Sequence, residues 1–276
     1  YFSDNPYPND CHSHPSRENI MNYLSNYSKK YNLFKYVKFN CEVKKTFWDD
    51  DKQKWIIKYL NKKQNKLYSI SKDFLCICSG FYTTPKNPDY KGLKKYYRNK
   101  SKYKYKIHHV SEWSYVGKQD VDSFKDKRVV IIGNGPSGCD MACLAHRHGA
   151  KEVILLYRTN KWILNRSHKI ISGFIVNKYF LWLGNYLPHV LILIVLYGFW
   201  YCSFYLFGYG RKINLELPNK AINRNNVSIN DEIMQFMYYK KVYYIKGIID
   251  ELKHDHIIIQ DVNGNLKSLK TDLIIN

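Results

Sequence analysis

Three glycines in the middle of the chain have the spacing of a phosphate-binding turn. Gly133, Gly135 and Gly138 follow an apolar run and precede a helix-like segment, in the stretch "RVVIIGNGPSGCD". In a G-x-G-x-x-G turn, the first glycine permits the tight turn and the second admits a pyrophosphate. The third lets the helix pack closely on the strand. The spacing therefore predicts a turn that can hold a dinucleotide.

The elements around the glycines decide between a nucleotide site and an ordinary turn. Residues 129–132 are β-branched and apolar, as in a strand buried on both faces of a parallel sheet. A helix would begin near Ser137 and stop at Gly149, and a second apolar strand would follow at residues 152–156. The helix N-terminus would point N–H groups at the ligand. Gly133, Gly135, Ser137 and Gly138 are predicted to bind the pyrophosphate, and Asn134 and Pro136 of the same turn are predicted to bind the cofactor.

Arg158 indicates which dinucleotide the turn would hold. NAD sites usually place Asp or Glu about 20 residues beyond the glycines, where this chain has Arg158. A guanidinium matches a 2′-phosphate, so the sequence predicts NADP, with a solvated surface arginine as the alternative. Asp140 either orients the loop or is an acid favoured by the helix dipole.

Composition limits the classes of partner. The chain has 276 residues and 45% apolar residues, enough for a large core and for two domains. Lys and Arg number 44 against 23 Asp and Glu, a net charge of +21. The excess is spread along the chain and accompanies abundant Asn, Tyr and Ile, which have A/T-rich codons. We interpret most of it as coding bias and predict no nucleic-acid binding, because no RNA-binding or zinc-finger signature is present.

The cysteines and histidines predict neither a redox pair nor a metal site. Seven cysteines without a C-x-x-C pair are typical of a reducing compartment. The pairs Cys76/Cys78 and Cys139/Cys143 are interpreted as small core residues. The histidine-containing stretches "CHSH" and "HRH" lack a third ligand, so no metal is expected.

A weak internal repeat predicts the fold class. Residues 33–80 read as a strand, two alternating strands joined by a polar turn, and an apolar strand. Residues 241–276 repeat that order, with "DVNGN" as a hairpin turn and Asp272 before "LIIN". We predict an α/β protein with two dinucleotide-binding, Rossmann-like domains, each with a parallel sheet and a small antiparallel meander.

Several segments together resemble the flavin-containing monooxygenase family of class B flavoprotein monooxygenases. They are "FSDNPYPND", "CSGFYTTPKNP", "GNGPSGCD" with Pro136 in the place of the usual Asn, "YRTNKWILNR" and "SINDEI". The family fingerprint is partly met by His109, Trp113 and Tyr103, with Tyr105 at the glycine position within "NKSKYKYK". The resemblance implies an oxidoreductase that binds FAD and NADP, with Gly80 close to the flavin.

The function that the resemblance implies is NADPH-dependent oxygenation of soft nitrogen or sulfur nucleophiles in small molecules by molecular oxygen. The cofactor supplies the hard chemistry and the protein supplies orientation and a dry pocket, so no catalytic side chain is assigned. Alternatives are a Baeyer–Villiger or N-hydroxylating flavoprotein monooxygenase, or a degenerate, non-enzymatic nucleotide-binding membrane protein. Neither the substrate nor the oligomeric state follows from the sequence, and a homo-oligomer is compatible with it.

Compared with the resembled family, the first nucleotide loop is missing before Tyr1. We therefore expect an internal fragment, inactive alone. Residues 1–112 would be the remainder of an FAD-binding domain, itself incomplete, and residues 113–276 an NADP-binding domain.

An apolar insert is expected at about residues 170–212. Residues 179–210 hold no Asp, Glu, Lys or Arg, and their aliphatic centre is flanked by Trp and Tyr. A single crossing would split one nucleotide domain across the bilayer, so we expect an in-plane or re-entrant helix. The alternative is a helix buried against the domain or a partner subunit. The insert predicts membrane association at the cytoplasmic face, with the endoplasmic reticulum as a candidate organelle.

Overall fold

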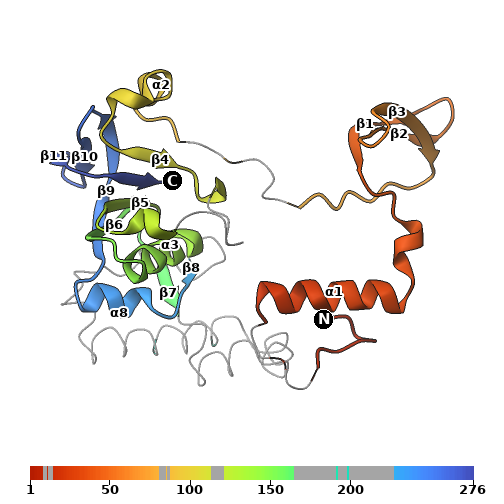
Figure 1. The fold of residues 1–276 in the computed structure, drawn as a ribbon, viewed down its shortest axis with the longest axis horizontal. Helices are drawn as coiled ribbons and strands as arrows, with labels where there is room; N and C mark the ends of the chain where they lie inside the picture. Colours follow the sequence, from red (N-terminus) through yellow and green to blue (C-terminus); the bar gives the residue numbers. More distant parts are fainter. Residues whose placement is uncertain are drawn as a thin grey trace. The chain divides into compact units, whose positions relative to one another are not determined.

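The computed structural model describes residues 1–8, 11, 15–80, 85, 88–112, 121–164, 191, 198 and 227–276. These residues divide into two units, Tyr1–Phe81 and Tyr82–Asn276, each of which is described by itself (Figure 1). The boundary predicted after residue 112 divides an FAD-binding region from an NADP-binding region. It differs from the division after Phe81 and stays a prediction.

The first unit joins a capped helix to an antiparallel meander. Helix α1 (Arg17–Lys30) begins at a capping box, in which the Ser16 hydroxyl accepts from the Asn19 N–H at 3.1 Å and the Asn19 side chain accepts from the Ser16 N–H. A 3₁₀ turn, η1 (Leu33–Tyr36), leads into three strands in the order β1-β2-β3. The strands are β1 (Cys41–Asp49), β2 (Lys54–Asn61) and β3 (Lys66–Lys72).

The predicted meander is confirmed, but two other predictions for this unit are wrong. Residues 74–80 form no strand, although their apolar sequence predicted one. Cys76 and Cys78 are exposed and not core residues, because the segment that carries them has no strand partner.

The second unit contains a seven-stranded sheet in the order β11-β10-β9-β6-β5-β12-β4. Five of these strands are parallel, from β9 through β6, β5 and β12 to β4, while β9, β10 and β11 form an antiparallel meander. This mostly parallel α/β sheet confirms the predicted Rossmann-like fold class. The strands are β4 (Lys106–His108), β5 (Arg128–Ile132), β6 (Glu152–Tyr157), β9 (Tyr243–Leu252), β10 (Ile257–Asp261), β11 (Leu266–Leu269) and β12 (Leu273–Ile275).

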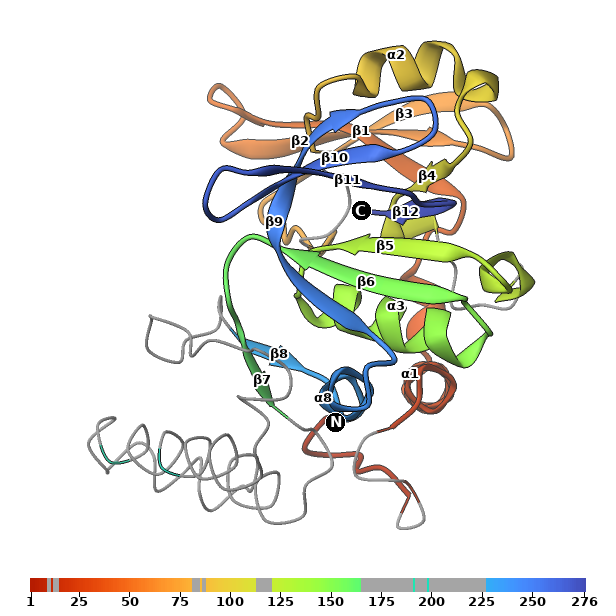
Figure 2. The same ribbon diagram turned by 90° about the vertical axis from the view of Figure 1, so that its left-hand side faces the viewer.

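Alternation along the central strands builds a core on each face of the sheet. Val129 and Ile131 of β5 pack in one cluster with residues of α3 (Pro136–Arg147) and α8 (Ile233–Tyr238). Val130 packs on the other face, in the cluster that includes Leu93 and Tyr96 of α2 (Leu93–Arg98). Figure 2 shows α3 running beside β5 and β6. Short 3₁₀ turns occur at η2 (Lys100–Lys102), η3 (Val110–Glu112) and η4 (Val121–Phe124).

The strands of a small two-stranded sheet precede and follow the predicted insert in the sequence. β7 (Trp162–Leu164) pairs in parallel with β8 (Val227–Ile229). The insert predicted at about 170–212 falls between these strands and lies outside the described residues, except for Leu191 and Gly198. Within the described ranges, no helix is both long and apolar enough to span a membrane.

Candidate functional site

The predicted glycine turn joins the carboxyl end of β5 to α3. Gly133 has φ +94°, a left-handed conformation that favours glycine, and its N–H donates to the Leu156 carbonyl at 2.8 Å. A Cβ on Gly138 would lie 1.9 Å from the Gly133 carbonyl oxygen. Only glycine fits there, because helix and strand meet at backbone contact. The first and third glycines therefore have the roles that the spacing predicted.

The middle glycine leaves the ligand side of the turn open. Gly135 is the N-cap of α3, with φ −72° and ψ 176°, and Pro136 follows as the first helical residue. Within the helix, the Cys139 N–H donates to the Gly135 carbonyl at 3.0 Å. The N–H groups of Ser137 and Gly138 have no intrahelical acceptor, since they belong to the first turn. Together with the helix dipole they form an anion-binding end.

Asn134, predicted to bind the cofactor, directs its side chain into the protein. It is 3% exposed, and its amide nitrogen donates to the Thr159 carbonyl at 3.0 Å and to the Tyr244 hydroxyl at 2.5 Å. The backbone carbonyl of Asn134 accepts from the Ser228 hydroxyl. Burial raises the pKa of Tyr244, so this hydroxyl stays protonated. The turn is thereby tied to the segment that follows β6, to β8 and to β9. Any contact of Asn134 with a ligand falls to its backbone.

Asp140 fastens α3 to the segment that follows β8. Its carboxylate accepts from the Asn230 amide at 2.7 Å. The Asn230 side-chain oxygen accepts from the N–H groups of Glu232 and Ile233 at the start of α8. This network favours the interpretation in which Asp140 orients the loop through its neighbours. The predictions from the sequence did not include Tyr244, while Ser228 and Asn230 lie in "SINDEI", which only the family resemblance had marked.

The sheet places two cations beside the turn. Arg158 directly follows β6 and is exposed, at the carboxyl edge of the sheet where ligands of such folds bind. Lys161 is half-buried, and its Nζ lies 3.8 Å from the position that a Cβ on Gly135 would take. The position of Arg158 after the second strand is as the sequence predicted, and its contact with a 2′-phosphate stays a prediction.

The remaining predicted residue lies in the first unit. Gly80 has φ +80°, and no described atom lies within 4 Å of the position of an added Cβ. Its assignment to the flavin stays a prediction from the resemblance.

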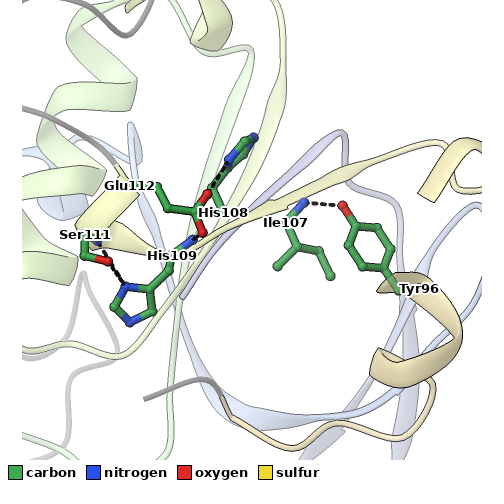
Figure 3. Close-up of polar contacts among 6 residues, drawn as sticks. All are labelled: Tyr96, Ile107, His108, His109, Ser111 and Glu112. Atoms are coloured by element: carbon green, nitrogen blue, oxygen red, sulfur yellow. Dashed lines mark hydrogen bonds and ion pairs between the residues drawn. The ribbon is translucent and has the colours of Figure 1, made fainter. Parts of the chain in front are cut away.

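A second polar cluster lies at the end of β4, on the same edge of the sheet as the glycine turn. His108 stands beside Ile275, which in turn pairs with Ile131. The Glu112 carboxylate contacts the His108 ring nitrogen at 3.2 Å and accepts from the His109 N–H at 3.3 Å (Figure 3). His109 Nδ1 lies 2.7 Å from the Ser111 hydroxyl. Trp113, its partner in the fingerprint, lies outside the described residues.

Tyr105, which occupies the glycine position of the fingerprint, is a core residue. It is 2% exposed, stacks on Tyr96 at 6.0 Å between ring centroids, and donates its hydroxyl to the Lys253 carbonyl at 2.7 Å. The Tyr96 hydroxyl accepts from the Ile107 N–H at 2.8 Å (Figure 3). Tyr96 and Tyr105 thus hold the strand that ends in the histidine cluster.

Among the described residues, the glycine turn holds no reactive thiol, and no cluster of metal-ligating side chains is present. Cys139 and Cys143 are buried, as predicted, and burial raises the pKa of each thiol to about 12. In the same ranges, no group of three or more His, Cys, Asp or Glu side chains is arranged to hold a metal ion.

Comparison with known proteins connects this geometry to one family. A family model for flavin-binding monooxygenase-like (FMO-like) proteins matches residues 1–275. The chain is 33% identical over 170 residues to flavin-containing monooxygenase 3 of Canis lupus familiaris, covering 60% of this chain and 29% of that protein. It is 30% identical over 166 residues to trimethylamine monooxygenase of Pelagibacter ubique, covering 59% of this chain and 34% of that protein. The chain therefore spans about a third or less of these relatives.

Solved structures show the same fold. The crystal structure of Tmm from a Pelagibacter species covers 98% of this chain with a TM-score of 0.54 at 20% identity, over 42% of its own length. An oxidized steroid monooxygenase bound to NADP covers 94% with a TM-score of 0.65 at 14% identity, over 56% of its length. OTEMO in complex with FAD and NADP gives a TM-score of 0.64 at 18% identity, with the same coverage of both chains.

Proposed function

The chain belongs to the flavin-binding monooxygenase-like family, and from that premise we propose that it forms part of an NADPH- and FAD-dependent monooxygenase. Its second unit binds NADPH at the turn between β5 and α3. The observation that carries this proposal is the contact between Gly138 and the Gly133 carbonyl, where an added Cβ would approach to 1.9 Å. That contact brings the N-terminus of α3 against the end of the strand, in the arrangement that admits a pyrophosphate.

The residues present fit the nicotinamide dinucleotide. Ser137 and Gly138 offer N–H groups, Gly135 leaves room for the phosphates, and Arg158 supplies a cation for the 2′-phosphate. The role of these residues is to bind and orient NADPH, which supplies reducing equivalents when bound. The FAD part of the proposal rests on family membership.

A titration tests the binding proposal. We expect the purified chain to bind NADPH more tightly than NADH, because only NADPH carries the 2′-phosphate. Calorimetry with both nucleotides measures this preference. A chain that binds neither nucleotide, or that prefers NADH, would overturn the proposal.

For the substrate, we propose a soft nitrogen or sulfur nucleophile of a small molecule, with molecular oxygen as co-substrate. The similarity to flavin-containing and trimethylamine monooxygenases supports this choice. A Baeyer–Villiger substrate is the second candidate, because a steroid monooxygenase shares the fold. Supplying the FAD- and NADPH-loaded protein with trimethylamine and with cyclohexanone, and identifying an N-oxide or a lactone, separates the two. The comparisons give no support to the non-enzymatic alternative.

A further inference from the structure

We propose that Lys161 is a further binding residue of the nucleotide site, and that its ammonium group contacts the pyrophosphate and not the 2′-phosphate. The inference rests on the proposed function and adds to the site a residue from outside the glycine turn.

The position of Lys161 is fixed by the strand that begins after it. Trp162 and Ile163 of β7 are 1% and 3% exposed, so the backbone next to Lys161 is anchored in the core. From there the side chain reaches back over the turn, and its Nζ lies 3.8 Å from the position of an added Cβ on Gly135. Gly135 has no Cβ, and in this motif the pyrophosphate approaches the backbone on the side where a Cβ would lie. The ammonium therefore borders the space that the phosphates would occupy.

The charge of Lys161 acts on the first turn of α3. Burial raises the pKa of the Cys139 thiol to about 12, and the Lys161 charge acts in the opposite direction on the same thiol. Asp140 is the acid in that turn, and its carboxylate is bonded to Asn230. In the described part of the chain, no carboxylate pairs with Lys161. A positive charge is thus held beside the end of the helix that already favours anions.

The turn itself explains why such a cation would matter. Pro136 has no N–H and so removes one donor from the loop that faces the phosphates. A lysine ammonium can donate three hydrogen bonds to phosphate oxygens and replace the missing donor. Arg158 lies earlier in the chain, at the end of β6, and is left for the ribose. Lys161 therefore contacts the pyrophosphate, and Arg158 contacts the 2′-phosphate on the ribose.

Three probes distinguish these roles in the full chain: NADPH, NADH and 2′-AMP, which has the 2′-phosphate but no pyrophosphate. We expect Lys161→Met to weaken NADPH and NADH by a similar factor, roughly 10-fold or more, as for loss of one charge-assisted contact. Binding of 2′-AMP should stay unchanged. Lys161→Arg, which keeps the charge, should restore most of the affinity. Lys151→Met, at the opposite end of β6, is the matched control and should change none of the three affinities.

Two results would overturn the inference while leaving the proposed function intact. One is unchanged affinity of Lys161→Met for both dinucleotides, and the other is a loss confined to NADPH and 2′-AMP. If the unmodified chain binds neither dinucleotide, the proposed function fails and this inference fails with it.

Discussion

At the scale of single residues, the choice between the two nicotinamide dinucleotides depends on Arg158. A charge-assisted contact to the 2′-phosphate contributes about 1.5–3 kcal/mol when shielded, and the exposure of Arg158 favours the lower end of that range. We expect Arg158→Ala to weaken NADPH about 10-fold and to leave NADH nearly unchanged. Calorimetric titration measures both, with the exposed Arg98→Ala as control. Equal losses for both nucleotides would show that Arg158 supports the fold instead.

Gly138 and Gly135 should respond differently to the same substitution. Gly138→Ala should lower the thermal unfolding midpoint and abolish NADPH binding, because its methyl group would lie 1.9 Å from the Gly133 carbonyl oxygen. Gly135→Ala should keep the midpoint nearly unchanged, since the added Cβ would have only Lys161 Nζ within 4 Å among the described atoms beyond its neighbours in the chain. It should still weaken NADPH by occupying the ligand side. Differential scanning fluorimetry and titration separate the effects, and an unchanged midpoint for Gly138→Ala would contradict the packing argument.

The positions of the glycines and of Arg158 relative to β5, α3 and β6 were predictable from the sequence because their spacing is local. The residues that hold the turn were not. Tyr244 lies 110 residues from Asn134 and Ser228 lies 94 residues from it, so only the fold brings them together. Tyr244 has no local signal, and Ser228 was marked only as part of "SINDEI", without a role. Likewise, the sequence suggested Asn134 as a ligand, whereas the structure uses its side chain to fasten the turn.

At the scale of elements, an ion pair joins the beginning of β5 to the beginning of β12. The Arg128 guanidinium donates to both Asp272 oxygens, at 3.0 and 2.8 Å, and the Asp272 carboxylate also accepts from the Arg128 N–H. The hydrogen bonds from Arg128 hold the pKa of Asp272 below its ordinary value. The pair therefore stabilises the fold above the ordinary carboxyl pKa, and this contribution disappears as the pH falls through the lowered pKa.

Asp272→Asn should lower the free energy of unfolding by about 1 kcal/mol at neutral pH, because the pair is partly solvent-exposed. The difference from the unmodified chain should shrink as the pH falls below about 4, the ordinary carboxyl pKa, because the carboxyl group then takes up a proton. Urea unfolding across this range measures the effect. Asp250→Asn, on β9, is the control, and a difference that stays constant with pH would contradict the role of the charge.

The sequence patterns predicted the two antiparallel meanders better than the strand at residues 74–80 or the pairing of distant strands. The alternation in residues 41–72 and the "DVNGN" turn gave the strands that the structure has, and the Asp261 carboxylate accepts from the N–H groups of Asn263 and Asn265 in that turn. Residues 74–80 were mispredicted because their apolar run indicated a buried strand, whereas they form no strand and Phe74 and Ile77 are exposed. The pairing of β4 with β12 depends on contacts far apart in sequence and had no local signal.

At the scale of the whole molecule, we propose that residues 179–210 attach the protein to a membrane surface. The segment has no Asp, Glu, Lys or Arg and lies between β7 and β8 in the sequence. Each large apolar side chain buried in lipid should contribute about 1.5–3 kcal/mol, so several would hold the protein without a crossing.

Replacing residues 179–210 by a short Gly-Ser linker should release the protein from membranes and keep NADPH binding, because β7 and β8 remain paired. Flotation with lipid vesicles measures attachment, and a nucleotide titration shows that the domain still folds. A folded variant that continues to float with vesicles would show that the segment is not the anchor.

The central claim is that the turn between β5 and α3 holds the pyrophosphate of NADPH. A crystal structure of the chain grown with NADP⁺ tests it most directly. We predict the pyrophosphate within hydrogen-bond distance of the Ser137 and Gly138 N–H groups, and the 2′-phosphate beside Arg158. A nucleotide bound elsewhere on the molecule, or one in this turn with its ribose turned away from Arg158, would contradict the account.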